Sequence, residues 1–224
     1  ASGKTALGVQ VAKRLGAEII SADSIQIYRG LDIGSAKPTQ EEMKGIPHHM
    51  LNVVEVDGPK FSVAAYQQQA RAIIHGLQQA NIFPLVVGGT GLYISALTSP
   101  LNFTETAGDE TLRRALQAQE QQQPGSLYAK LQREDPASAQ RLHPNDIKRI
   151  VRALEVKQLT GKPIGAAFAQ AASAPCPYDL TMVGLTMPRP LLYARIEQRV
   201  DQMLEQCLRW GVSVARAVTA VWKI

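Results

Sequence analysis

The chain has 224 residues, of which 45% are hydrophobic and 19% charged, and its formal net charge is +5. This composition is typical of a globular protein with a buried core, long enough for one large domain or for a core with an insertion. No run of 18 apolar residues occurs, and the two cysteines and four histidines show no paired spacing. These features argue against a membrane span, a disulfide framework and a zinc site, and we expect a protein of the reducing cytoplasm.

The first hundred residues alternate helices with short apolar strands. A helix is predicted over residues 4–15, followed by a stop at Gly16 and a buried strand over 17–21. One face of that helix carries Leu7, Val11 and Leu15.

Ser62 is predicted to cap the next helix, whose inner face consists of Tyr66, Ala70, Ile73, Ile74 and Leu77. An apolar strand over 83–87 then leads into a glycine-rich turn at 88–91 and another helix start. Helices and strands that alternate in this way are typical of a doubly wound parallel sheet.

From about residue 102 the sequence becomes rich in glutamine and charge, with helices predicted over 109–122, 125–134 and 145–160. No strand is predicted between them, so this part reads as a helical insertion.

A strand over 180–185 and an amphipathic helix over 190–208 are predicted to return to the core. The inward side of that helix is predicted to carry Leu192, Ile196, Val200, Met203 and Leu204. The predicted domains are therefore a core over 1–101, an insertion over 102–178 and a return to the core over 179–224.

The chain opens on Ala1-Ser2-Gly3-Lys4-Thr5, the second half of the P-loop pattern G-x-x-x-x-G-K-[ST]. Backbone N–H groups at the start of a helix hold phosphate oxygens there, Lys4 adds a point charge, and the Thr5 hydroxyl is placed to bind Mg²⁺. Five small and polar residues can also occur by coincidence, but the helix and strand that follow favour a P-loop. An ATPase, a nucleoside kinase and a diphosphate-cleaving transferase all fit this loop.

Asp23 follows the strand predicted over 17–21 and should lie beside the P-loop, where crevices of parallel sheets hold ligands. A carboxylate in this place can accept a proton from a nucleophile above the phosphates. It can equally cap a helix or assist Mg²⁺, and position alone does not choose between these roles.

Five blocks of sequence occur in a fixed order. They are Asp23-Ser24 to Ile27-Tyr28 with Asp32-Ile33-Gly34 and Ala36-Lys37-Pro38; Pro47-His48; Val87-Gly88-Gly89-Thr90-Gly91-Leu92-Tyr93; His143-Pro144-Asn145-Asp146 leading to Arg149 and Arg152-Ala153-Leu154-Glu155; and Arg195-Ile196-Glu197-Gln198-Arg199. With these blocks, residues 1–208 resemble the tRNA dimethylallyltransferases, also called tRNA isopentenyltransferases. The fold class implied is α/β, a P-loop NTPase-like doubly wound parallel sheet with a helical insertion domain.

The resemblance implies transfer of a dimethylallyl group from dimethylallyl diphosphate to the exocyclic N6 amine of the adenine 3′ to the anticodon, in tRNAs that read codons beginning with U. Asp23 would be the general base or hydrogen-bond acceptor for that amine, and Thr90 would help to fix the base or the scissile oxygen. Residues 1–5 would hold diphosphate with Mg²⁺ as cofactor. The tRNA-binding residues implied in this part of the chain are Asp23, Ser24, Ile25, Gln26 and Thr90.

Two clusters of cations are further candidates. Lys148, Arg149 and Arg152 share one side of the predicted 145–160 helix, and without the resemblance a solvated face balanced by Asp146 and Glu155 explains them. With the resemblance, they and Arg113 are expected to contact phosphates of the anticodon stem-loop.

Arg195 and Arg199 lie four residues apart on the predicted late helix, a spacing that is also common for solvated side chains. In the family an arginine on this helix closes over the diphosphate, and Arg199 matches it best, with Arg195 beside it. A bidentate guanidinium suits that task.

The resemblance ends at both termini, because the strand and first glycine of a complete P-loop are absent and the sequence after residue 208 is atypical. We therefore expect a truncated family member, monomeric, whose activity is weak or lost. Two alternatives stay open: a P-loop small-molecule kinase, and an inactive tRNA-binding fragment.

Overall fold

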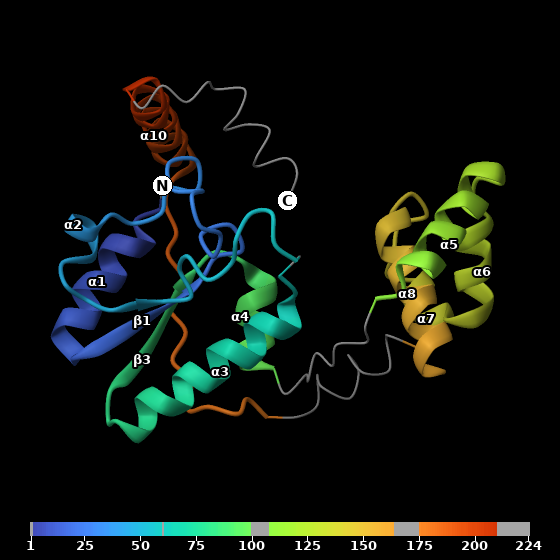
Figure 1. The fold of residues 1–224 in the computed structure, drawn as a ribbon, viewed down its shortest axis with the longest axis horizontal. Coiled ribbons are helices and arrows are strands. Elements are labelled where there is room, and N and C mark those ends of the chain that lie inside the picture. Colours follow the sequence, from blue (N-terminus) through green and yellow to red (C-terminus); the bar gives the residue numbers. More distant parts are fainter. Residues whose placement is uncertain (1, 60, 100–107, 164–174, 210–224) are drawn as a thin grey trace. The chain divides into compact units, whose positions relative to one another are not determined.

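The computed structural model describes residues 2–59, 61–99, 108–163 and 175–209 (Figure 1). The chain divides into two compact units, Ala1–Thr98 with Asp179–Ile224, and Ser99–Tyr178. Ala1 and the atypical tail from residue 210 lie outside the described residues.

The first unit is built on a parallel sheet of β1 (Ala17–Ala22), β2 (His48–His49) and β3 (Phe83–Gly88) in the order β2-β1-β3. The central strand pairs in register with both neighbours, Ile19 opposite His48 on one side and Leu85 on the other. The side chains of β1 point to the two faces of the sheet, and almost all of them are buried because helices cover both faces. The α/β fold with a parallel sheet that the sequence predicts is confirmed.

Helices connect these strands on both faces of the sheet, with α1 on one side and α3 and α4 on the other (Figure 1). Their bounds are α1 Lys4–Leu15, α2 Gln40–Met43, α3 Val63–Gln79, α4 Gly91–Thr98 and α10 Arg189–Arg209. Ser62 caps α3 as predicted, because its side chain accepts a hydrogen bond from the N–H of Ala65 at 3.1 Å. Tyr66, Ala70, Ile74 and Leu77 on α3 are buried.

The buried face of α1 differs from the expected one. Leu7 and Leu15 are 39% and 55% exposed, whereas Gly8, Val9 and Ala12 are buried. The reason is the close approach of the helix to β3: a Cβ added at Gly8 would lie 2.8 Å from a methyl carbon of Val87. Small residues are needed at this contact, so leucine periodicity does not identify it.

The prediction of a strand over 180–185 is wrong, because this segment belongs to no strand. Within it, Met182 is 63% exposed and Val183 is 74% exposed. An apolar run becomes a strand only where a neighbouring strand can pair with its backbone. In the described part of the unit no strand pairs with it, and β3 pairs only with β1.

The helix predicted over 190–208 is confirmed as α10, but its apolar side is not buried as expected. Ile196, Val200 and Leu204 are exposed. Over the described residues, no other helix or strand packs extensively along α10. Its periodicity therefore predicts an amphipathic helix correctly but not the burial of the apolar face.

The second unit consists of helices alone over its described residues, as the sequence predicts. They are α5 Glu110–Gln122, α6 Ser126–Glu134, α7 Pro136–Ala139 and α8 Ile147–Thr160. Leu116, Leu127, Leu131, Ile150 and Leu154 form the centre of its core. Across the described helices of both units, none combines the length and the apolar character needed to cross a bilayer.

Candidate active site

A cavity of about 480 Å³ opens in the first unit where β1 and β3 end and α1 begins. The carboxyl ends of parallel strands are the usual place for ligands in such sheets. The charged and polar side chains that line the cavity belong to Ser2, Lys4, Thr5, Gln10, Asp23, Gln26, Ser35, Glu42, Lys44, Arg195, Gln198, Arg199 and Gln202.

The start of α1 presents positive charge to this cavity. Gly3 precedes the helix in the left-handed region, at φ 87°, and the first turn contains no acidic residue. Lys4 Nζ donates to Ser2 Oγ at 3.3 Å and lies close to Gly89, where an added Cβ would be 3.6 Å away. The N-terminal N–H groups and the ammonium are therefore directed at the same space, which suits a phosphate group.

Asp23 directly follows β1 and lines the cavity. Its Oδ1 accepts hydrogen bonds from the N–H groups of Ile25 at 2.9 Å and Gln26 at 3.3 Å, so the capping role considered for this residue is present. Over the described residues, no group donates to Oδ2. One carboxylate can thus hold the turn with one oxygen and accept a proton or a hydrogen bond with the other.

The turn after β3 is tied to the turn after β1. The N–H groups of Gly89 and Thr90 both donate to Ala22 O, at 3.2 and 3.0 Å. A Cβ at Gly88 would lie 2.2 Å from that same oxygen, so only glycine allows the two strand ends to approach this closely. Thr90 does not itself line the cavity; its Oγ1 is bonded to Ser24.

Gln26 has a fixed side-chain orientation. Its Nε2 donates to Ser35 O at 3.1 Å and to Ala36 O at 3.2 Å. Because both partners are carbonyl oxygens, the atom that faces them must be the amide nitrogen. The remaining atom, Oε1, is an acceptor, so a ligand that meets Gln26 must bring a donor. Ile25, another candidate residue of this turn, is half-buried and does not line the cavity.

Two tyrosines of the motif blocks, Tyr28 and Tyr93, are part of the core. Tyr93 packs face to face on Tyr66 with ring centroids 3.8 Å apart, and Tyr93 and Tyr28 are both buried. Burial, with smaller contributions from Tyr28 and Asp23, raises the pKa of Tyr93 to about 12. Burial likewise raises the pKa of Tyr66, whose hydroxyl donates to Ser21 O. Both hydroxyls stay neutral at physiological pH.

Both candidate arginines of α10 line the cavity, and Arg199 Nη2 also contacts Ala36 O at 3.5 Å. Gln198 and Gln202 lie on the same side of the helix, three and seven residues after Arg195. That spacing is a signal that could have identified these glutamines from the sequence. Lys44 and Glu42 also line the cavity, and no sequence signal singled them out.

In the second unit, the basic candidates have different surroundings. Arg113 Nε and Arg152 Nη1 lie 2.8 and 2.6 Å from the buried carboxylate of Glu155. Arg149 pairs with Asp146 at 3.3 Å and is exposed, and Lys148 is exposed as well. Arg113 and Arg152 therefore help to hold α5 against α8, whereas Lys148 and Arg149 face solvent.

Comparison with known proteins explains this combination of features. The sequence model of the IPP transferase family matches residues 26–214. The chain belongs to the IPP transferase family. The family match covers Gln26, both arginines of α10 and the whole insertion; Asp23 and the P-loop residues precede it.

Individual relatives agree. The tRNA dimethylallyltransferase of Pelotomaculum thermopropionicum is 50% identical over 204 residues, which cover 91% of this chain and 64% of that protein. The protein of the same name from Symbiobacterium thermophilum is 52% identical over 205 residues, which again cover 91% of this chain and 64% of that protein. The chain thus spans slightly less than two thirds of the length of these two relatives.

Solved structures show the same relationship. The full-length tRNA isopentenylpyrophosphate transferase of Bacillus halodurans has a TM-score of 0.60 and 40% identity, and the match covers 98% of this chain and 70% of that one. A eukaryotic dimethylallyltransferase, captured acting on tRNA, has a TM-score of 0.81 and 28% identity. That match covers 100% of this chain and 54% of the eukaryotic one.

Proposed function

We propose that the protein transfers a dimethylallyl group from dimethylallyl diphosphate to the N6 amine of the adenine 3′ to the anticodon, in tRNAs that read codons beginning with U. The observation that carries this proposal is the single cavity lined by Asp23 and Gln26 as well as by Lys4, Thr5 and Arg199. Hydrogen-bond acceptors and phosphate-binding cations are thus within reach of one ligand. Family membership favours this reaction over phosphoryl transfer by a kinase.

The acceptors match the nucleophile. An adenine amine has only N–H bonds to offer, and Asp23 Oδ2 and Gln26 Oε1 are both acceptors. The amine nitrogen forms a bond to C1 of the dimethylallyl group as the C1–O bond breaks, and diphosphate leaves with that electron pair. The amine proton passes to the carboxylate of Asp23, which acts as a general base.

The cations match the leaving group. Negative charge develops on the diphosphate as the C1–O bond breaks, and the N–H groups of α1, Lys4 and Arg199 are fixed around the space it would occupy. Fixed donors stabilise a transition state without reorganising. Thr90 acts less directly, by holding Ser24 and the turn that follows Asp23.

Mg²⁺ fits this site. The ion keeps several waters and uses few protein oxygens together with substrate phosphates. The Thr5 hydroxyl and the Asp23 carboxylate both line the cavity and are oxygen donors of the required kind. Mg²⁺ would neutralise charge on the diphosphate, and Thr5 would hold it.

The insertion is proposed to bind the anticodon stem-loop. Lys148 and Arg149 are the exposed cations of α8 that are available for phosphates. Arg113 and Arg152 would contribute less, because the carboxylate of Glu155 neutralises part of their charge. The target adenine must leave its base stack to reach Asp23. We expect the protein to act as a monomer in the cytoplasm.

The test is incubation of the protein with Mg²⁺, radiolabelled dimethylallyl diphosphate and tRNAs that read codons beginning with U. We expect label at N6 of the adenine next to the anticodon and none in tRNAs that read other codons. Phosphate transfer from γ-labelled ATP without prenyl transfer would support the kinase instead. Binding of tRNA with no transfer of either label would support a tRNA-binding fragment.

A further inference from the structure

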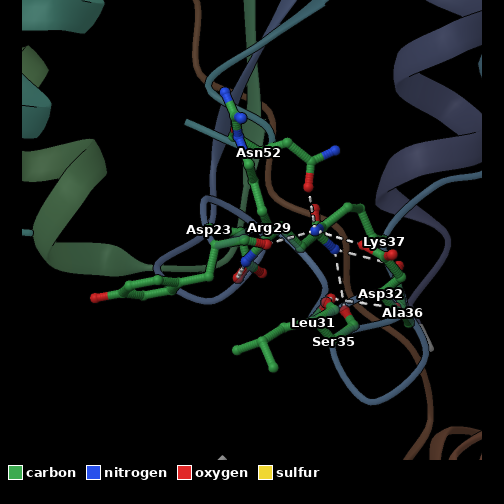
Figure 2. A network of polar contacts seen from close by, with 10 residues as sticks. Asp23, Arg29, Leu31, Asp32, Ser35, Ala36, Lys37 and Asn52 are labelled. Carbon is green, nitrogen blue, oxygen red and sulfur yellow. Dashed lines mark hydrogen bonds and ion pairs between the residues drawn. The ribbon is translucent and has the colours of Figure 1, made fainter. Parts of the chain in front are cut away.

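Lys37 is a buried lysine outside the cavity, with an exposed side-chain fraction of 4%. Its ammonium lies 2.6 Å from each of three oxygens, Tyr28 O, Asp32 Oδ1 and Asn52 Oδ1 (Figure 2). An ammonium group has three N–H bonds and no acceptor, so three oxygens satisfy it fully. A buried lysine is tolerated only with such compensation.

The three oxygens come from separate segments. Tyr28 ends the turn that follows Asp23, Asp32 lies in the loop after it, and Asn52 follows β2 in the left-handed region at φ 55°. The backbone N–H of Lys37 also donates to Asp32 O at 3.0 Å. One side chain therefore closes the loop over residues 29–36 and ties it to the segment after β2.

This loop supplies the carbonyl oxygens that orient the Gln26 side chain in the cavity. Ser35 O and Ala36 O receive both N–H bonds of the Gln26 amide, and Ala36 O also receives Arg199 at 3.5 Å. Ala36 is itself held at φ 50°, which costs free energy unless its surroundings hold it there. Without these carbonyls, the Gln26 amide would be free to rotate and present N–H groups to the cavity.

We propose that Lys37 is a positioning residue, which holds the 29–36 loop so that Gln26 presents an acceptor to the substrate. The inference rests on the proposed function for the nature of that substrate. Lys37 acts through the loop and touches neither the adenine nor the diphosphate. It therefore differs from Lys4, whose ammonium faces the cavity directly.

The first test is a double-mutant cycle on kcat/KM for tRNA, with Lys37→Met, Gln26→Leu and the double variant. We expect each single change to lower kcat/KM by about tenfold or more, because misplaced contacts of this kind are costly. If Lys37 acts through Gln26, the double variant falls no further than the worse single variant within a factor of about three. Effects that multiply would overturn the proposal. Lys13→Met, in the last turn of α1, is the matched lysine control and should be unchanged.

The second test needs no catalysis. In ¹⁵N spectra of the full chain, the side-chain amide protons of Gln26 should exchange slowly with water, because both are bonded to carbonyls. Lys37→Met should accelerate that exchange by about tenfold, and Asp32→Ala, which removes one exposed acceptor, should do so more mildly. Asp32→Ala also covers the case in which Lys37→Met does not fold.

The two tests separate two failures. If the wild-type protein transfers no dimethylallyl group, the proposed function fails, and the Gln26 exchange rates still decide the role of Lys37. If Gln26 exchange is the same in wild type and in both variants, Lys37 does not orient Gln26, whatever the protein transfers.

Discussion

The backbone N–H of Ser24 donates to the Oγ1 of Thr90 at 3.0 Å, and the two hydroxyl oxygens lie 3.3 Å apart. Ser24 follows β1 and Thr90 follows β3, so this contact joins the two turns at the edge of the cavity. The hydroxyl of Thr90 therefore contacts the residue that follows Asp23 and does not line the cavity. Thr90 thus fixes the position of the carboxylate that we propose as the base.

Replacing Thr90 by Val should lower kcat for transfer by about 100-fold, because the loss of the acceptor frees the turn after Asp23. The two side chains have similar shape, so the fold should be retained, which far-UV circular dichroism and the melting temperature can check. Thr98→Val on α4 removes a hydroxyl that donates to Ile94 O within its own helix, and this variant serves as the control. Equal kinetics of both variants would contradict the role of Thr90.

Asp23→Asn separates the structural role of Asp23 from its chemical role. The amide keeps an oxygen for the N–H groups of Ile25 and Gln26, so the turn should persist. It cannot accept the amine proton, and general-base catalysis contributes about 10²- to 10⁴-fold. We expect kcat to fall by at least about 100-fold in single-turnover measurements. Asp57→Asn, an exposed carboxylate, should leave kcat unchanged, and a wild-type rate for Asp23→Asn would exclude the base assignment.

Arg199→Lys should raise KM for dimethylallyl diphosphate about tenfold. A guanidinium can form two parallel hydrogen bonds to diphosphate, whereas an ammonium forms a point contact, and one charged hydrogen bond contributes about 1.5 kcal/mol. Steady-state kinetics with the diphosphate as the varied substrate measure this change. Arg189→Lys, in the first turn of the same helix, is the matched control. A KM unaffected by Arg199→Lys would indicate that Arg199 is a solvated side chain that does not bind the diphosphate.

Lys148→Ala should weaken tRNA binding and reduce the slope of log K against log salt by about one, as expected for the loss of one phosphate contact. Lys130, which lies 4.0 Å from Glu134, provides a lysine control within the same unit. The slope for Arg152→Ala should change less, because Glu155 already neutralises part of its charge. An unchanged slope for Lys148→Ala would indicate a solvated helix face.

Glu155 should make the stability of the second unit dependent on pH. Burial alone would raise the pKa of this carboxyl, but hydrogen bonds from Arg152, Arg113 and the N–H of Asp109 outweigh it and lower the pKa. Its contribution is therefore complete above the unfolded pKa of about 4.3 and is lost as pH falls through the lower folded value.

Glu155→Gln removes this dependence. It should lower the free energy of unfolding at pH 7 by about 3 kcal/mol, since it leaves two guanidinium groups without a buried partner charge. Urea unfolding between pH 7 and pH 3 measures both quantities, and Glu110→Gln on the exposed side of α5 is the control. A difference between wild type and Glu155→Gln that stays constant over this range would contradict the lowered pKa.

The sequence by itself determined the longer helices, the strands over 17–22 and 83–88, and the family. The Ser62 helix cap, the apolar strands and the ordered motif blocks are local signals, and each depends on neighbours a few residues away. Eight of the candidate residues in the first unit line one cavity, because parallel strands deliver their carboxyl ends to one edge of the sheet. They are Ser2, Gly3, Lys4, Thr5, Asp23, Gln26, Arg195 and Arg199.

Only the tertiary structure decided which groups act on which. Gly8 replaces the leucines as the contact of α1 because β3 approaches it closely. Residues 180–185 form no strand because none of the strands in the described part of the chain pairs with them. The opening residues match half of a P-loop, and in the folded chain they line a cavity together with the ends of β1 and β3. Gly88 allows these two strand ends to approach each other closely. Lys37 bonds to oxygens as far as 15 residues away in the sequence, and Glu155 to a residue 46 away. Such contacts between distant segments leave no local pattern, so they appear only once the chain is folded.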